Sequence, residues 1–272
     1  MTNVAAVLLI GAVLGLVIGL LGGGGGILAV PLLIAVGQPF LVASSQSLVI
    51  VSAGALAALV PHHRAGRVDW RVGLTFGVLG TVGAVVGARL AAYVEPAILL
   101  GCLTLLLLAG AVAMLRAATG EQTRAETHAE ARLEPAGDGT EPPSPTAGSA
   151  AASKPQVVGL ASSVGLVTGL MGVGAGFVVV PALVSAMKLP VKKATATALV
   201  VIVINSAVAL AVRHGSTGGL AVTAGLAVAS AAFAVIGALL SRLVPGWALS
   251  TAFGVLLILV AGYTTVKAVL GL

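Results

Sequence analysis

Charged side chains are scarce in this chain of 272 residues, where Asp, Glu, Lys and Arg together make up only 8%. Hydrophobic residues make up 58%, and the mean hydropathy is +1.15. A water-soluble domain carries about three times this proportion of charged residues. The composition therefore excludes an ordinary soluble protein and indicates an all-α, polytopic integral membrane protein.

Carboxylates are missing from every long apolar run. This absence argues against a proton relay through buried Asp or Glu and favours a path for anions. The net charge of +6 reports on cytoplasmic loops, which collect Lys and Arg, and gives no reason to expect a nucleic-acid partner. The eight acidic residues all lie between or after the runs, at Asp69, Glu95, Glu121, Glu126, Glu130, Glu134, Asp138 and Glu141.

Groups for catalysis or metal binding are also scarce. The chain has one cysteine, Cys102, so neither a disulfide nor a thiolate metal site can form within it. No nucleophile with an adjacent base is evident, so we expect no enzymatic activity, no cofactor and no metal site. His62 and His63 lie in a basic stretch, and we interpret them as solvated loop residues.

Glycine, in contrast, is abundant, with 37 residues, and its most unusual pattern occurs twice. The segment Gly19–Leu33 returns 150 positions later as Gly169–Leu183. Such an internal repeat predicts two related halves. Because glycine is unfavourable inside a regular helix, each copy predicts a helix that is broken at membrane depth. The positions that align without a gap are Gly19/Gly169, Gly22/Gly172, Gly24/Gly174, Gly26/Gly176 and Pro31/Pro181.

A polar stretch separates the two apolar halves. We predict a first repeat at residues 1–116, a disordered acidic linker at 117–155 and a second repeat at 156–272. The linker has three basic and six acidic side chains and no apolar periodicity. In each half, the broken run is followed by three runs long enough to cross a bilayer. These lie at about 43–60, 72–93 and 97–115 in the first half, and 194–212, 220–243 and 247–270 in the second.

Positive charge is distributed differently over equivalent loops of the two halves. Cytoplasmic loops collect Lys and Arg, so equivalent loops are expected on opposite sides of the membrane. We therefore predict inverted repeats, in which each broken run is a re-entrant hairpin followed by three transmembrane helices. Parallel repeats with eight plain spans are the alternative. The decisive residues are Arg64, Arg67 and Arg71 in the second loop of the first half, and Lys188, Lys192 and Lys193 in the first loop of the second half.

The glycine breaks are the predicted binding site. A helix that starts after a break offers unpaired backbone N–H groups and the positive end of its dipole to an anion. We expect the two breaks to meet near the middle of the membrane, with hydroxyl and amide side chains adding donors. Alternatively, these side chains bond to carbonyls of neighbouring turns. The predicted substrate-binding residues are Gly22, Gly23, Gly24, Gly25, Gly26, Ser44, Ser45, Gln46, Gly172, Gly174, Gly176, Thr195, Thr197 and Asn205.

The doubled pattern Gly-Leu-x-Gly-x-Gly-x-Gly-x-x-x-x-Pro resembles the sulfite exporter TauE/SafE family, also called the 4-toluene sulfonate uptake permease family. It occurs at Gly19–Pro31 and Gly169–Pro181, and the openings Ala43–Leu48 and Ala194–Leu199 resemble the family too. The resemblance implies a multi-pass permease of a bacterial-type inner (plasma) membrane that carries sulfite, sulfoacetate or another organosulfonate. The long acidic linker departs from the family pattern, so the substrate stays open.

We predict that the chain is a transporter for a small sulfur-containing anion. Its expected partners are that anion and the lipid bilayer, and a homodimer is one compatible assembly. The alternatives are an anion channel, a transporter for a different small anion, and a membrane scaffold or sensor that transports nothing. The sequence leaves the direction of transport and the coupling ion open.

Overall fold

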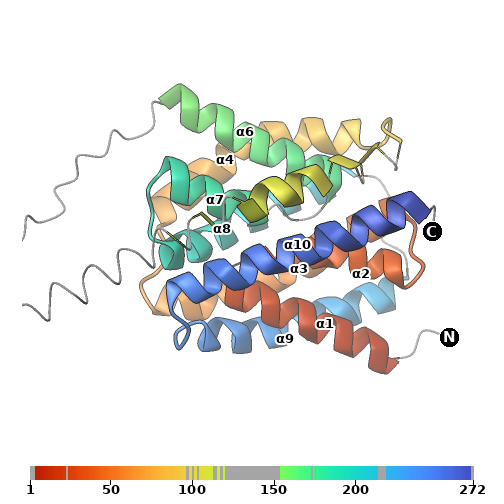
Figure 1. Ribbon diagram of the computed structural model, residues 1–272, viewed down its shortest axis with the longest axis horizontal. Coiled ribbons are helices and arrows are strands. Elements are labelled where there is room, and N and C mark those ends of the chain that lie inside the picture. The colour runs from red at the N-terminus through yellow and green to blue at the C-terminus, as the bar shows by residue number, and fades with distance from the viewer. Residues whose placement is uncertain are drawn as a thin grey trace, which may run out of the picture.

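The computed structural model describes residues 4–22, 24–95, 98–99, 101–102, 104–112, 115–116, 119, 154–172, 174, 176–213 and 219–270. Within these residues every regular element is a helix (Figure 1), which confirms the predicted all-α class. Apart from residues 119, 154 and 155, the predicted linker lies outside the described residues. The predicted span at 97–115 is described mainly at residues 104–112, which are helical.

Four of the helices are long and apolar enough to cross a membrane, namely α3, α4, α8 and α9. The first half contains α1 (Val4–Leu21), the short 3-10 helix η1 (Gly24–Leu28), α2 (Ala29–Ala35), α3 (Phe40–Arg64) and α4 (Trp70–Leu90). The second half contains α6 (Lys154–Met171), α7 (Gly176–Ala186), α8 (Val191–Val212), α9 (Leu220–Leu240) and α10 (Gly246–Leu270).

Local sequence sets where the central helices begin. Pro39 and Pro190 stand directly before α3 and α8, where their fixed φ and missing N–H suit a helix start. Asp69 precedes α4, and its carboxylate accepts a hydrogen bond from the backbone N–H of Val72 at 3.1 Å. This bond satisfies one of the donors that a helix start leaves free.

Helices α3 and α8 lie side by side in opposite directions. Leu48 of α3 packs with Ala209 of α8, and Arg213, directly after α8, bonds to Ser44 in the first turns of α3. We call the end of the bundle where α3 begins and α8 ends the Arg213 end. The opposite end, where α3 ends and α8 begins, is the His62 end.

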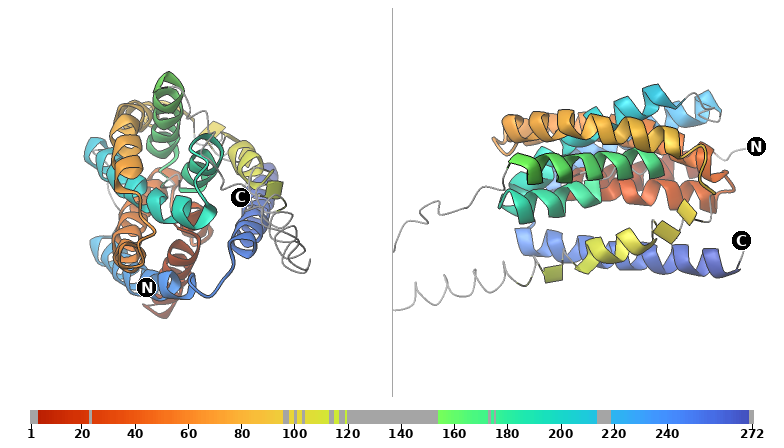
Figure 2. Two further views of the ribbon diagram at one scale, coloured as in Figure 1. Left: turned by 90° about the vertical axis from the view of Figure 1, so that its left-hand side faces the viewer. Right: turned by 90° about the horizontal axis from the view of Figure 1, so that it is seen from above.

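Helices α1 and α6 also run in opposite directions (Figures 1 and 2). The carbonyl of Gly19, near the end of α1, lies 3.3 Å from Nε2 of His62. The carbonyl of Gly169, near the end of α6, accepts a bond from Nη2 of Arg213 at 2.6 Å. After each break the short helix returns, so α2 leads to the start of α3 and α7 to the start of α8. Each broken run therefore enters and leaves at one end of the bundle.

The helices that precede the two glycine breaks, α1 and α6, end near opposite ends of the bundle. Helices α1 and α6 have 18 residues each, which corresponds to about 27 Å, nearly the thickness of a bilayer core, about 30 Å. Ser44 contacts the second break, and His62 contacts the end of α1 at the first. These two residues are about five turns apart on α3, or roughly 27 Å. The ends of α1 and α6 therefore lie near opposite ends of α3. From there the chain turns back inward, because Gly174 lies beside Val51, near the middle of α3, and η1 of the first break contacts α7 after the second. The meeting of the two breaks near the middle of the membrane stays a prediction.

Glycines make close backbone contacts between the two halves. A Cβ on Gly15 of α1 would collide with the backbone of Ser230 in α9, and a Cβ on Gly165 of α6 would collide with the backbone of Gly80 in α4. The two contacts involve residues that correspond at the spacing of 150. Small residues of this kind let membrane helices approach closely.

Replacing Gly165 with alanine should destabilise the bundle, since overpacking costs about 1–3 kcal/mol. We expect Gly165→Ala to lower the thermal unfolding temperature of the protein in detergent. Gly159→Ala in the same helix is the control, because a Cβ there meets nothing within 4 Å and alanine is the better helix former. Equal melting temperatures for the two variants would contradict the packing account.

Candidate functional site

The first glycine break is packed tightly against α8 and against its own helix α1. Gly22 has a left-handed backbone, with φ of 63°, and a Cβ there would collide with Thr195. The chain then coils into η1, where a Cβ on Gly25 would come within 2.5 Å of the backbone nitrogen of Ile18 and 2.6 Å of the carbonyl carbon of Val17. Successive glycines therefore let the chain fold back onto α1.

The second glycine break has a different conformation. Gly172 and Gly174 both have left-handed backbones, with φ of 65° and 61°, and neither belongs to a helix. A Cβ on Gly172 would collide with the hydroxyl of Ser44, and a Cβ on Gly174 would come within 2.6 Å of a methyl carbon of Val51. The second break therefore lies against the first half of α3.

Arg213 reaches from the end of α8 to this second break. Its Nη2 donates to the carbonyls of Gly169 at 2.6 Å and Leu170 at 3.0 Å, and its Nη1 donates to Oγ of Ser44. The Ser44 hydroxyl donates in turn to the carbonyl of Met171 at 2.9 Å. These bonds satisfy carbonyls at the end of α6 that have no partner inside the helix. The described partners of Arg213 are all neutral.

The positive charge of Arg213 persists at neutral pH. Burial lowers the pKa of the guanidinium to about 10, so the group stays protonated at pH 7. Its Nε is buried and has no hydrogen-bond partner among the described residues. Arg213 thus combines a retained charge with a donor that is not in use.

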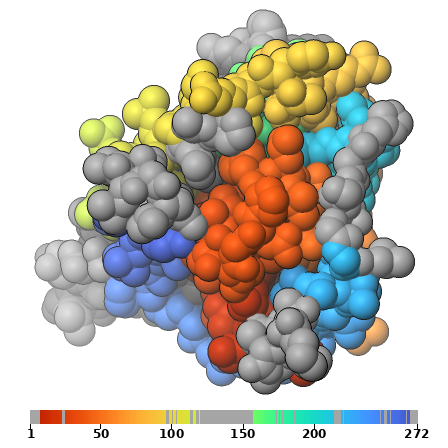
Figure 3. All heavy atoms as spheres, turned by 90° about the vertical axis from the view of Figure 1, so that its right-hand side faces the viewer, coloured from red at the N-terminus to blue at the C-terminus, as the bar shows by residue number. Residues whose placement is uncertain are grey.

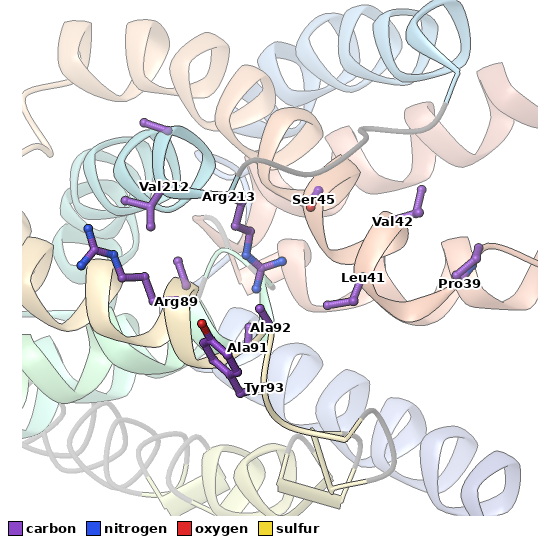
Figure 4. A pocket seen from close by; sticks show the side chains of 12 residues that line it. Pro39, Leu41, Val42, Ser45, Arg89, Ala91, Ala92, Tyr93, Val212 and Arg213 are labelled. Carbon is purple, nitrogen blue, oxygen red and sulfur yellow. The ribbon is translucent and has the colours of Figure 1, made fainter.

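A cavity of about 940 Å³ lies at the Arg213 end, between the start of α3 and the ends of α4 and α8. Figure 3 looks at this end and shows the start of α3 (orange) between the end of α4 (yellow) and helices of the second half (blue). Ser45, Arg89, Tyr93 and Arg213 line the cavity. In Figure 4 the Arg213 guanidinium points into the cavity, whereas the Arg89 side chain points away from it.

The position equivalent to Arg213 at the first break is His62. One extra residue in the second half makes the spacing between α3 and α8 151, which pairs Ser44 with Thr195 and His62 with Arg213. His62 is only 3% exposed, because α3 continues to Arg64 and buries the ring beside Gly19. The interpretation of His62 as a solvated loop residue is therefore wrong.

The neighbouring His63 is exposed, as expected, although it belongs to α3. Its Nδ1 accepts a hydrogen bond from the indole N–H of Trp70 at 3.0 Å. Sequence comparison at the spacing of 151 would have singled out His62 and Arg213, whereas the glycine spacing of 150 does not align them.

The other predicted site residues fall into three groups. Ser44, Ser45 and Gly172 lie near Arg213. Asn205 is 1% exposed, faces Gly80 of α4, and has no hydrogen-bond partner for its amide among the described residues. Three others bond to neighbouring elements or turns: Gln46 Nε2 donates to Thr223 Oγ1, Asp69 N donates to Thr197 Oγ1, and Thr195 Oγ1 donates to Lys192 O, each at 3.1 Å.

The remaining predicted glycines that the structure describes lie within a helix or at its start. Gly24, Gly25 and Gly26 form part of η1, and Gly176 opens α7. Gly23 lies outside the described residues. The structure therefore gathers Ser44, Ser45 and Gly172 near Arg213, while η1 of the first break contacts α7, which follows the second break.

Comparison with known proteins places the chain in a family. The profile described as Sulfite exporter TauE/SafE matches residues 7–266. The chain belongs to the sulfite exporter TauE/SafE family. The TauE/SafE chain is thus a membrane transporter, and membership indicates a permease instead of an enzyme.

Two relatives of this TauE/SafE transporter come from Xylella fastidiosa, and each is named "Probable membrane transporter protein". The one from strain 9a5c is 31% identical over 195 residues, which cover 71% of this chain and 67% of the relative. The one from strain Temecula1 / ATCC 700964 is 33% identical over 198 residues, with the same two shares. No solved structure matches the chain.

The second break of this TauE/SafE transporter should not tolerate a side chain at Gly172. We expect Gly172→Ala to lower the flux of the transported substrate in proteoliposomes by at least about tenfold, because the methyl group collides with Ser44 and overpacking of 1–3 kcal/mol is sufficient for such a loss. Gly66→Ala is the control, since Gly66 has a matching φ of 66° with nothing within 4 Å. Unchanged flux in Gly172→Ala would assign the second break to packing alone.

Proposed function

We propose that the protein transports a small sulfur-containing oxyanion, such as sulfite or sulfoacetate, and binds it beside Arg213 at the second glycine break. The observation that carries this proposal is the Arg213 guanidinium at the wall of a 940 Å³ cavity, with neutral described partners only. A guanidinium offers two parallel N–H donors to an oxyanion, and such charge-assisted bonds are about twice as strong as neutral ones. The hydroxyl of Ser45, which also lines the cavity, adds a donor.

Anion binding also gives a route to conformational change. In this structure Arg213 bonds to the carbonyls at the end of α6. An oxyanion in the cavity competes for the same guanidinium, and its negative charge makes it the stronger acceptor. When Arg213 turns toward the anion, the end of α6 loses its partners and the hairpin of α6 and α7 becomes free to move.

We propose further that the two halves are inverted repeats, comprising residues 1–116 and 156–272 and joined by the linker 117–155. The opposite directions of α1 and α6 support this arrangement. So do the equivalent contacts of Gly22 with Thr195 and of Gly172 with Ser44. Rocking of one repeat against the other would then alternate access to the two ends.

The charge distribution assigns a side to each end. Basic residues gather at the His62 end, which on the positive-inside rule is cytoplasmic. The Arg213 cavity would then open to the outside. The described basic residues at the His62 end include Arg64, Arg67, Arg71, Lys188, Lys192, Lys193 and Arg242, whereas Arg89 and Arg213 lie at the other end.

Arg213→Gln should lower the flux of the transported anion by at least about tenfold, since hydrogen bonds to charged groups contribute about 1.5–3 kcal/mol. Arg89→Gln is the matched control, because Arg89 lines the same cavity but points away from it, and its flux should stay within about threefold of the wild type.

The assay compares sulfite, thiosulfate, sulfoacetate and taurine with acetate in proteoliposomes. If the wild-type protein moves none of these sulfur-containing compounds, the proposed function is wrong. If the two arginine variants lose flux equally, the assignment of the site to Arg213 is wrong.

A further inference from the structure

Unpartnered polar atoms are concentrated on α3, α8 and the residue that caps α8. They are buried, and none has a hydrogen-bond partner among the described residues. Buried hydroxyl and amide groups are normally paired, so each of these groups calls for an explanation. The atoms are Gln46 Oε1, Ser47 Oγ, Ser52 Oγ, both amide atoms of Asn205, Ser206 Oγ and Arg213 Nε.

These atoms all lie in one half of the contact between α3 and α8. We call the contact between the two antiparallel helices the α3–α8 seam. The spacing of 151 and the packing of Leu48 with Ala209 place its midpoint at Ala53 and Ile204. The unpartnered groups on α3 come before Ala53, and those on α8 and its cap come after Ile204. They therefore occupy only the half of the seam at the Arg213 end.

In the other half of the seam, at the His62 end, the equivalent side chains of α3 and α8 are apolar or have hydrogen-bond partners. The residues equivalent to Ser47, Ser206 and Asn205 are small and apolar: Ala198, Ala55 and Gly54. The buried polar side chains that this half does contain all have partners, because His62 contacts Gly19 O, Thr195 donates to Lys192 O and Thr197 accepts from Asp69 N. Among the described side chains of α3, α8 and its cap, the unpartnered polar groups thus lie only in the half of the seam at the Arg213 end, although the Ser230 hydroxyl of α9 faces Gly54 in the other half.

The unpartnered groups lead inward from the Arg213 cavity. Ser47 lies on the same face of α3 as Ser44 and Val51, at spacings of three and four residues, and these two neighbours contact Gly172 and Gly174. Ser47 is therefore positioned at the second break. On α8, Ser206 precedes Arg213 by seven residues, or two turns, and so shares its face.

Asn205 is the innermost of these donors. It lies one position from the midpoint of the seam, and a Cβ on Gly80 would come within 2.8 Å of its Nδ2 and 2.9 Å of its Oδ1. Glycine at position 80 therefore lets the amide pack directly against the backbone of α4. The amide itself is buried and makes no hydrogen bond among the described residues.

We propose that Ser47, Ser206 and Asn205 form an inner subsite for an oxyanion that enters past Arg213. Serine hydroxyls and the asparagine amide donate hydrogen bonds, and an oxyanion accepts several at once. The donors are neutral, so the anion is held less tightly there than beside Arg213 and can move on. The apolar half of the seam stops the anion at the midpoint in this conformation. This inference rests on the proposed anion transport.

Cysteine substitutions at equivalent positions test the inner subsite. In a Cys102→Ser background, we compare Ser47→Cys and Ser206→Cys with Ala198→Cys and Ala55→Cys. The probe is 2-sulfonatoethyl methanethiosulfonate, an anionic thiol reagent that follows the path of a sulfonate, applied from outside. We expect the first pair to react at least about tenfold faster than the second, corresponding to a difference in free energy of 1.4 kcal/mol. Equal rates in both pairs, or no reaction at any position, would overturn the inner subsite.

The flux assay supplies a second and independent readout. Asn205→Ala should lower flux by at least about tenfold, while membrane insertion stays intact. Ser230→Ala is the control, because Ser230 is equally buried and unpartnered among the described residues but lies on α9, where its hydroxyl packs against Gly54 in the half of the seam at the His62 end. Equal losses in the two variants would overturn the role of Asn205. Absence of flux in the wild type would instead overturn the proposed function, so the two failures are distinguishable.

Discussion

The hydrogen bonds at the ends of α1 and α6 are the interaction on which the rest of the structure depends. A helix that stops inside a bilayer leaves carbonyls without partners, and lipid supplies no donors. Arg213 and Ser44 satisfy the end of α6, and His62 contacts a carbonyl at the end of α1. All three belong to or cap α3 and α8, so the seam between these helices fixes both hairpins at once.

The two hairpins are equivalent in place but different in chemistry. A permanently charged arginine stands at the second break, and a histidine stands at the first. The first break is coiled into η1 against its own helix, whereas the second includes two left-handed glycines outside any helix. Polar groups continue inward from Arg213 and stop at the middle of the seam. The two ends of the repeat are therefore chemically unlike, although their contacts match.

Much of this fold could be predicted from sequence because the signals were local. Long apolar runs give the helices, and the doubled glycine pattern gives the place where each hairpin turns. The lengths of α1 and α6 could not be predicted, because glycine marks a turn without saying how far the preceding helix reaches. His62 and Arg213 were missed because their partners, Gly19 and Gly169, are 43 and 44 positions away, and only packing brings them together.

In this account the two hairpins enter the membrane from opposite sides, and cysteine labelling tests this arrangement most directly. In a Cys102→Ser background, Gln38→Cys follows the first hairpin and Lys188→Cys follows the second. A membrane-impermeant maleimide applied from outside should label Gln38→Cys at once, and Lys188→Cys only after the membrane is permeabilised. Equal labelling of the two positions in intact cells would contradict the account.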